Sequence, residues 1–136
     1  MLKRPFWLGI VIMVVAFDSQ NYVVVEIKGR TAEVRNDKPF LLYLSMKPIG
    51  GIHINVEPPI SVKQLDDMTA LNVKKVPKSG EYLDSSKPIE VECKVKGVGA
   101  GPHKLRFVVD YTYCSDKEGW CRMGKDTVSA TVRVKK

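Results

Sequence analysis

Alternation of apolar and polar residues, interrupted at short intervals by turn-forming residues, is the feature that most limits how this chain can fold. Residues 89–96 alternate Ile, Val, Cys and Val with charged Glu and Lys. Residues 105–113 and 128–134 follow the same period of two. In a strand, a period of two places every second side chain on the same face. Each segment therefore predicts a β-strand with one buried face.

Two further segments, residues 22–27 and 40–44, are apolar, and the first is rich in β-branched residues, so both also predict strands. Residues 62–71 show only weak helical character. Clusters of Pro and Gly separate the segments, at residues 47–51, 57–59, 77–80 and 97–102. About seven short strands, with turn signals roughly every 8–12 residues, are typical of an antiparallel sandwich. We therefore predict an all-β protein.

Length and charge exclude several classes of protein. The 136 residues are 44% hydrophobic and 27% charged, a balance that excludes wholesale disorder. The chain is too short for a typical barrel enzyme or a two-domain dinucleotide enzyme. Its net charge of +7 is dispersed along the sequence, so we predict no nucleic-acid partner.

The first twenty residues have the pattern of an export signal. Lys3 and Arg4 precede an apolar run at residues 6–17, which is shorter than the roughly twenty residues that cross a bilayer. We predict a signal peptide or an uncleaved tether at residues 1–20 and one domain at residues 21–136; a buried N-terminal strand is the alternative. Membrane contact would then occur only through an uncleaved segment. Export to a periplasmic or other extracytoplasmic location would allow disulfides to persist.

Two of the three cysteines flank a predicted hairpin. Cys114 ends one strand and Cys121 precedes the next, with six residues between them that include Gly119. A hairpin end can bring two such residues within disulfide distance. Closing an eight-residue loop contributes only about 2.5 kcal/mol, whereas a short exposed disulfide is the kind that exchanges. A structural role and a redox role both remain open on spacing alone.

Other candidate residues have structural interpretations. Cys93 shares the apolar parity of its strand and is predicted to be a buried free thiol. Both His53 and His103 precede Cys114, whereas a blue-copper site needs a His soon after its Cys, and no closely spaced cysteine pair supplies half of a zinc site, so we predict no metal. We expect His53 to hold a structural or pocket-lining place. Hydrolase motifs are absent, and no cofactor is required.

Aromatic residues surround the cysteine pair. Tyr111 and Tyr113 fall on the apolar parity of their strand, so packing within the sandwich is the simplest role for them. Trp120, next to Cys121 on a polar loop, has two open roles: it shields the disulfide or contacts a partner.

The hairpin segment resembles a known family. Residues 105–114 (LRFVVDYTYC), the spacer and Trp120-Cys121 are similar to the N-terminal periplasmic domain of the thiol:disulfide interchange protein DsbD family. Residues 51–55, followed by Pro58-Pro59, and residues 86–91 resemble other segments of that domain, so the resemblance covers about residues 22–134. It implies an immunoglobulin-like antiparallel β-sandwich with a redox-active cysteine pair on a hairpin. It also implies transfer of reductant from a membrane partner to thioredoxin-like or other exported oxidoreductases.

The resemblance assigns roles to individual residues. Cys121 would attack a partner's disulfide and Cys114 would resolve the mixed disulfide. Tyr82 is the nearest counterpart of the family's aromatic cap, and Tyr113 is a further candidate for shielding the pair or contacting a partner. The spacer is one residue longer than in the best-known member, and a chain ending at Lys136 would need its membrane electron donor in a separate polypeptide. The alternatives are a non-catalytic binding or assembly module with a structural disulfide and, more remotely, a metal-trafficking domain.

Overall fold

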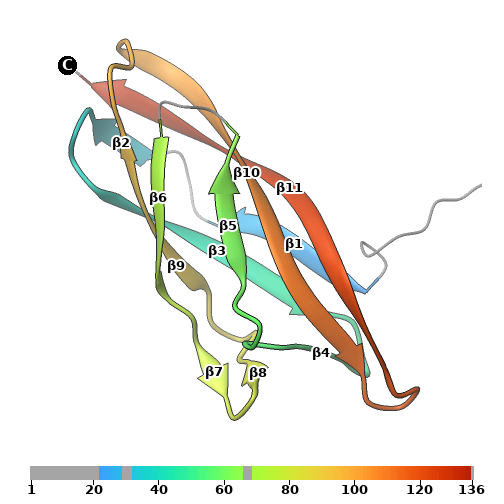
Figure 1. Cartoon of the computed structure of the whole chain (residues 1–136). Helices are drawn as coiled ribbons and strands as arrows, with labels where there is room; N and C mark the ends of the chain where they lie inside the picture. Colours follow the sequence, from blue (N-terminus) through green and yellow to red (C-terminus); the bar gives the residue numbers. More distant parts are fainter. Residues whose placement is uncertain (1–21, 29–31, 66–68, 136) are drawn as a thin grey trace, which may run out of the picture.

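The computed structural model describes residues 22–28, 32–65 and 69–135, so the predicted signal at residues 1–20 lies outside it. The described residues form strands, turns and loops, with no helix among them (Figure 1). The strands, in chain order, are β1 (Val23–Lys28), β2 (Ala32–Arg35), β3 (Phe40–Pro48), β4 (Ile52–Ile54), β5 (Ser61–Gln64), β6 (Thr69–Lys75), β7 (Lys78–Ser79), β8 (Tyr82–Leu83), β9 (Ile89–Val95), β10 (Gly101–Ser115) and β11 (Trp120–Lys135). In this part of the chain, no helix is long and apolar enough to span a membrane.

Nine of these strands form two sheets that pack face to face, and β7 and β8 pair as a separate two-stranded sheet. One has the order β1-β3-β9-β6, and the other has the order β2-β11-β10-β4, with β5 also paired to β10. Pairing within both sheets is antiparallel except between β2 and β11. In an immunoglobulin-like sandwich, strands A, B, E and D form one sheet and strands C, F and G form the other. The order β1-β3-β9-β6 corresponds to the first of these sheets, and β4, β10 and β11 correspond to the second. The predicted fold class is confirmed.

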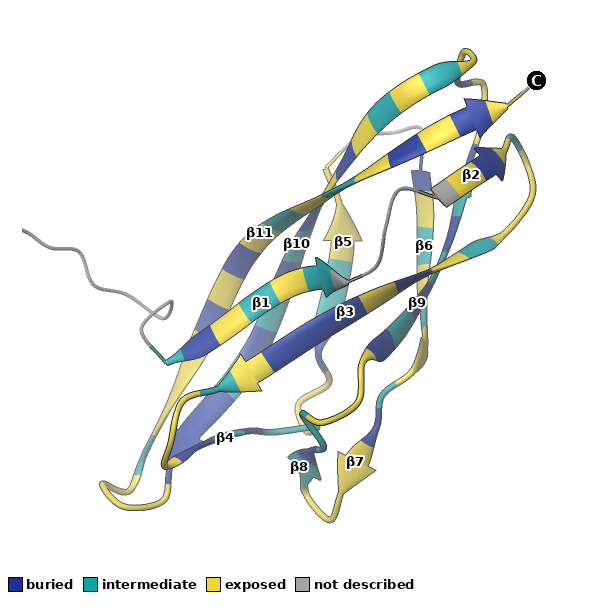
Figure 2. Ribbon diagram, turned by 180° about the vertical axis from the view of Figure 1, so that it is seen from behind, coloured by how far each residue is buried: buried dark blue, intermediate teal, exposed yellow. Residues whose placement is uncertain are grey.

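The core lies between the two sheets, as Figure 2 shows by the dark blue bands along their strands. In β9 the burial alternates at every residue, as the sequence pattern predicts. Across the core, Phe107 and Val109 of β10 are 1% and 0% exposed. One apolar face of each sheet is therefore removed from water, which is the main source of stability in a sandwich.

The described ends of the segment with weak helical character, residues 62–64 and 69–71, are extended. Residues 62–64 belong to β5, which pairs with β10, and residues 69–71 belong to β6, which pairs with β9. Pairing with a neighbouring strand satisfies the hydrogen-bonding groups of the backbone and buries part of each side chain. Such tertiary pairing outweighs a weak local preference.

Strands β10 and β11 form a long hairpin whose register runs without a shift from Gly101↔Val134 to Ser115↔Trp120. Within it, Tyr111 lies opposite Gly124, and its hydroxyl donates a hydrogen bond to the carboxylate of buried Asp126 at 2.5 Å. A Cβ on Gly124 would lie 2.5 Å from the Tyr111 ring, so the ring occupies the space that a side chain would need. The hairpin tip extends to the end of the sandwich at which β4, β7 and β8 lie (Figure 1).

Candidate functional site

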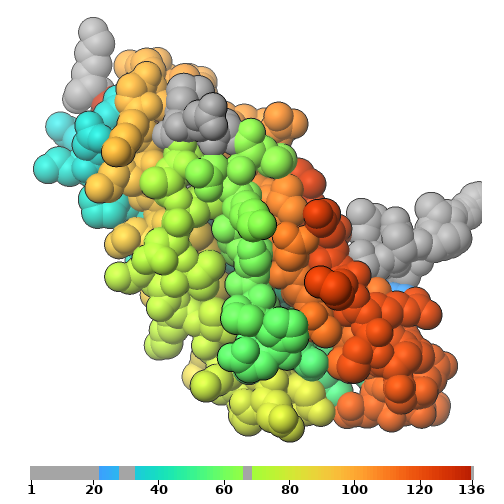
Figure 3. Space-filling model, in the orientation of Figure 1, coloured from blue at the N-terminus to red at the C-terminus, as the bar shows by residue number. Residues whose placement is uncertain are grey.

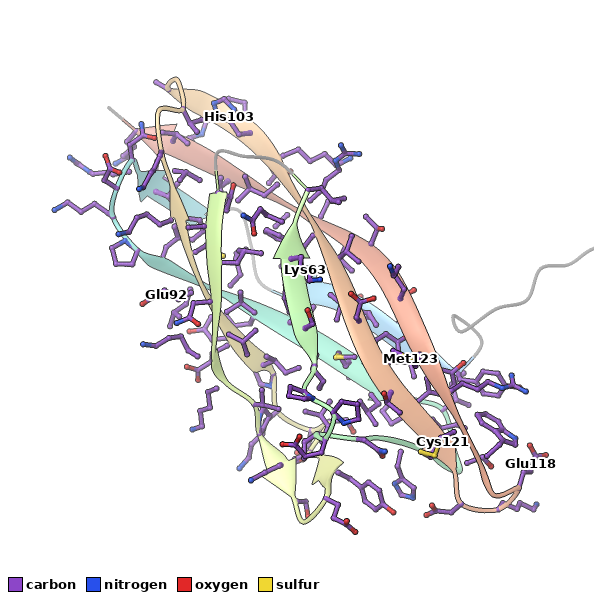
Figure 4. The ribbon with its side chains drawn as sticks, viewed as in Figure 1. Lys63, Glu92, His103, Glu118, Cys121 and Met123 are labelled. Carbon is purple, nitrogen blue, oxygen red and sulfur yellow. A yellow bond between two sulfur atoms is a disulfide. The ribbon has the colours of Figure 1, made fainter. Side chains whose placement is uncertain are left out.

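A disulfide joins Cys114 and Cys121 across the β10–β11 hairpin. The two residues are direct cross-strand partners, with an S–S distance of 2.07 Å and a Cα–Cα distance of 4.0 Å. The predicted disulfide on a hairpin is therefore confirmed; Figure 4 shows its sulfur atoms close to the hairpin tip. The two cysteines differ in exposure, because Cys114 is 9% exposed whereas Cys121 is exposed.

The turn that follows Cys114 holds the two strands together. Gly119 has a φ of 74°, a conformation that favours glycine, and its N–H donates a 2.8 Å hydrogen bond to the carbonyl of Ser115. The Ser115 hydroxyl accepts a 3.1 Å hydrogen bond from the Glu118 N–H. The polar spacer thus forms a turn whose hydrogen bonds keep the cysteines opposite each other.

Strand β4 covers Cys114 from the other side of β10. It pairs His53 with Cys114, and the Asn55 N–H that follows donates to the carbonyl of Thr112 at 2.9 Å. The Asn55 side-chain amide then donates a hydrogen bond to Cys114 Sγ at 3.4 Å. Cys114 is consequently enclosed by neighbouring strands on both sides, whereas Cys121 lies on β11, whose other partner, β2, pairs with it only at residues 132–135.

A pocket of about 540 Å³ opens beside the disulfide. It lies between the tip of the β10–β11 hairpin, the residues after β4 and the β7–β8 hairpin, and both cysteines line it. Figure 3 shows the two hairpins at the same end of the molecule. Three carboxylates and one ammonium group are among the lining side chains: Glu57, Glu81, Asp116 and Lys78. An incoming group could therefore reach the sulfurs through a predominantly acidic opening.

Tyr82 connects the β7–β8 hairpin to the disulfide region. Its ring lines the pocket and stacks on His53, with centroids 4.2 Å apart and an interplanar angle of 13°. His53 Nε2 lies 2.6 Å from Asp116 Oδ2, which belongs to the hairpin turn. The structure therefore brings Tyr82, the predicted cap residue, to the same pocket as both cysteines.

Trp120 belongs to an aromatic cluster at the tip of the hairpin. Its ring contacts Tyr22 and Tyr113 edge to face, with centroids 5.3 and 5.9 Å apart. The Arg122 guanidinium lies 4.3 Å from the centroid, and the Trp120 indole N–H donates to Glu118 at 2.6 Å. Trp120 lines the pocket, whereas Tyr113 is 2% exposed and packs beneath it. Trp120 is thus placed to meet a partner or shelter the disulfide, and Tyr113 supports it.

Sequence reasoning missed Asn55 and Asp116 as site residues. Asn55 ends the segment 51–55, to which the sequence assigned no role, and it reaches the site by a contact with a residue distant in sequence. Asp116 lies in the spacer between the cysteines, but its contact with His53 joins distant segments. A hydrogen bond from Asn55 to a cysteine 59 residues away has no local sequence signal.

The third cysteine takes no part in this site. Cys93 is a free thiol that is 0% exposed, as its place on the apolar parity of β9 predicts. Burial, with a further contribution from Glu92, raises the pKa of the Cys93 thiol to about 12. The thiolate is the reactive form of cysteine, so this residue is inert in the folded protein.

We expect iodoacetamide at pH 8 to leave Cys93 unmodified in the native protein and to alkylate it once urea unfolds the chain. A pKa near 12 in place of the ordinary 9 lowers the thiolate fraction at this pH roughly a thousandfold. Mass spectrometry of native and unfolded samples measures the difference. Rapid alkylation of Cys93 in native buffer would contradict its burial.

Comparison with known proteins finds similar solved structures but does not identify a family for this chain. No family model and no curated protein sequence matches this chain. Among solved structures, murine CRIg is similar over 85% of this chain and 99% of its own, with 8% identity and a TM-score of 0.41. The ZirS C-terminal domain is similar over 96% of this chain and 86% of its own, with 13% identity and a TM-score of 0.35. Similarities this distant assign neither a family nor an activity.

Proposed function

We propose that this protein exchanges disulfides with other exported proteins through Cys114 and Cys121. The observation that carries the proposal is the position of the bond: it lies at a hairpin tip, beside a pocket, with one sulfur on an exposed residue. Disulfides that are exposed and easily opened are the ones used in exchange, whereas structural bridges resist reduction.

The first half of the cycle reduces the protein. A thiolate of a dithiol donor attacks Cys121 Sγ, the sulfur of the more exposed cysteine, and the S–S bond breaks with its electron pair going to Cys114 Sγ. A second donor thiolate then attacks the donor sulfur of the mixed disulfide and releases Cys121 as a thiolate. The donor leaves as a disulfide, and Cys114 and Cys121 are left as the reduced pair.

The second half passes the electrons on. The Cys121 thiolate attacks a partner's disulfide and forms a mixed disulfide, and one partner thiolate leaves. The Cys114 thiolate then attacks Cys121 Sγ, so the original bond re-forms and the partner departs with both cysteines reduced. No cofactor is needed, because the sulfur atoms carry both electrons.

Two considerations support this role over a purely structural one. The chain buries an apolar core of more than twenty side chains, against which a short-loop disulfide adds only about 2.5 kcal/mol. The segment containing the pair also resembles the DsbD N-terminal domain, whose partners are a membrane electron donor and exported thioredoxin-like oxidoreductases. We propose partners of the same two kinds here, in an extracytoplasmic compartment.

The test is the reduction potential of the Cys114–Cys121 pair. We would equilibrate the purified protein with glutathione redox buffers, quench with acid and count free thiols by alkylation and mass spectrometry. Exchange predicts a midpoint above about −300 mV, within reach of biological thiols. A midpoint well below that value would contradict the proposal and favour a binding or assembly module whose disulfide only holds the hairpin.

A further inference from the structure

We propose that Asn55 is a catalytic residue of this exchange, because its side-chain amide stabilises the thiolate that Cys114 becomes when the disulfide opens. The inference rests on the proposed function and names the group that sets the direction of bond cleavage. Asn55 contacts a reacting atom directly, since its Nδ2 lies 3.4 Å from Cys114 Sγ.

The backbone around Asn55 holds the amide in this place. The Asn55 N–H donates to the carbonyl of Thr112 at 2.9 Å, which aligns it with β10 two residues before Cys114. On its other side, Asn55 forms an isolated β-bridge with Tyr82. The side chain therefore projects from a backbone fixed by two neighbouring segments, so little reorganisation is needed when charge develops on the sulfur.

The other end of the same side chain gives an independent indication of function. Asn55 Oδ1 is buried and, within the described part of the chain, has no hydrogen-bond partner. A buried amide oxygen without a partner lowers stability, and such groups call for an explanation. The hydrogen bond from Asn55 to Cys114 supplies this explanation. It requires a side-chain amide at a position where an apolar side chain would leave no buried oxygen without a partner.

The acidic lining of the pocket is the reason that a hydrogen-bond donor to the Cys114 sulfur matters. Glu57, Glu81 and Asp116 line the pocket with the disulfide, against the single cation Lys78. A thiolate formed among these carboxylates is disfavoured by like charge, and a hydrogen bond to the charged form opposes that effect. Asn55 is therefore placed to offset an acidic surrounding at the one sulfur that it contacts.

The contact also sets the direction of the reaction. When a donor thiolate attacks Cys121 Sγ, the electron pair of the S–S bond moves to Cys114 Sγ, which Asn55 stabilises as the leaving group. A leaving thiol of lower pKa departs faster. In the release step the same hydrogen bond keeps more of Cys114 as the thiolate that attacks the mixed disulfide. Protons needed to neutralise the reduced pair come from solvent.

The experiment compares Asn55→Leu and Asn55→Asp with the parent protein. Leu removes the donor and fills the site, whereas Asp keeps the size and replaces the donor with an acceptor. The pKa of the Cys114 thiol is measured by thiolate absorbance in a Cys121→Ser background, where Cys93 stays protonated because its own pKa is about 12. Reduction of the intact disulfide by dithiothreitol is followed separately.

Both variants are expected to raise the pKa of the Cys114 thiol by about one to two pH units, the effect of losing one hydrogen bond to a charged group. Reduction by dithiothreitol should slow about three- to tenfold. The matched control is Asn72→Leu, the same change at an exposed position of β6, which should alter neither quantity. Urea denaturation verifies that each variant is folded.

An unchanged pKa and an unchanged reduction rate in folded Asn55 variants would overturn the proposal. The glutathione titration of the parent protein keeps this outcome separate from failure of the proposed function. A reduction midpoint far below that of biological thiols would contradict the exchange activity. The catalytic role of Asn55 would then fall with it, even if the Asn55 variants still changed the pKa of the Cys114 thiol. A midpoint within reach of biological thiols, with the pKa and the reduction rate unchanged in the Asn55 variants, would leave the proposed exchange intact and contradict only the role of Asn55.

Discussion

Replacing Cys114 with serine is expected to trap a mixed disulfide on Cys121, and replacing Cys121 is expected not to trap one on Cys114. The exposed Cys121 meets an incoming disulfide directly, and without Cys114 no thiolate is available to release it. Cys114 is only 9% exposed, so a disulfide from solution reaches its thiol slowly. With glutathione disulfide as the probe, we expect adduct formation at least about tenfold faster in Cys114→Ser than in Cys121→Ser.

Intact-protein mass spectrometry at timed intervals measures the two rates. The double variant Cys114→Ser/Cys121→Ser keeps only the buried Cys93 and serves as the baseline. Equal rates for the two single variants would show that exposure does not select the attacking sulfur. A preference for Cys114 would reverse the roles assigned to the pair.

Gly124→Ala is expected to destabilise the fold by about 2–4 kcal/mol. The new Cβ would lie 2.5 Å from two ring atoms of Tyr111, which is 2% exposed and has little room to move. Displacing the ring also threatens the 2.5 Å hydrogen bond from the Tyr111 hydroxyl to buried Asp126. The cost therefore combines overpacking with a weakened buried hydrogen bond.

Urea denaturation with an unchanged m-value measures this loss as a lower midpoint. The control is Gly99→Ala, where a Cβ would meet nothing within 4 Å, and we expect a change within about 0.5 kcal/mol. Similar midpoints for the two variants would mean that the Tyr111 ring moves aside without cost.

Much of the fold could be predicted from local patterns. Alternation in β9 and β10 indicated which side chains are buried, including Cys93 and Phe107. Two cysteines flanking a polar spacer with Gly119 indicated the hairpin disulfide, because a tight turn sets the register of the two strands that it joins. The extended structure of residues 62–64 and 69–71 was not predicted, since their pairing partners are distant strands. The export signal and the DsbD relationship remain predictions.

Local residue patterns were enough to predict that this chain forms strands, that their apolar faces pack together, and that Cys114 and Cys121 meet at a hairpin. Each of these follows from residues close together in the chain. The surroundings of the disulfide depend on packing between distant segments: Asn55 contacts Cys114, Tyr82 stacks on His53 at the pocket, and Cys121 is exposed. This is because the pocket forms where the end of β4, the β7–β8 hairpin and the tip of the β10–β11 hairpin come together. Contacts between segments so far apart depend on how the two sheets pack, and no local pattern encodes them.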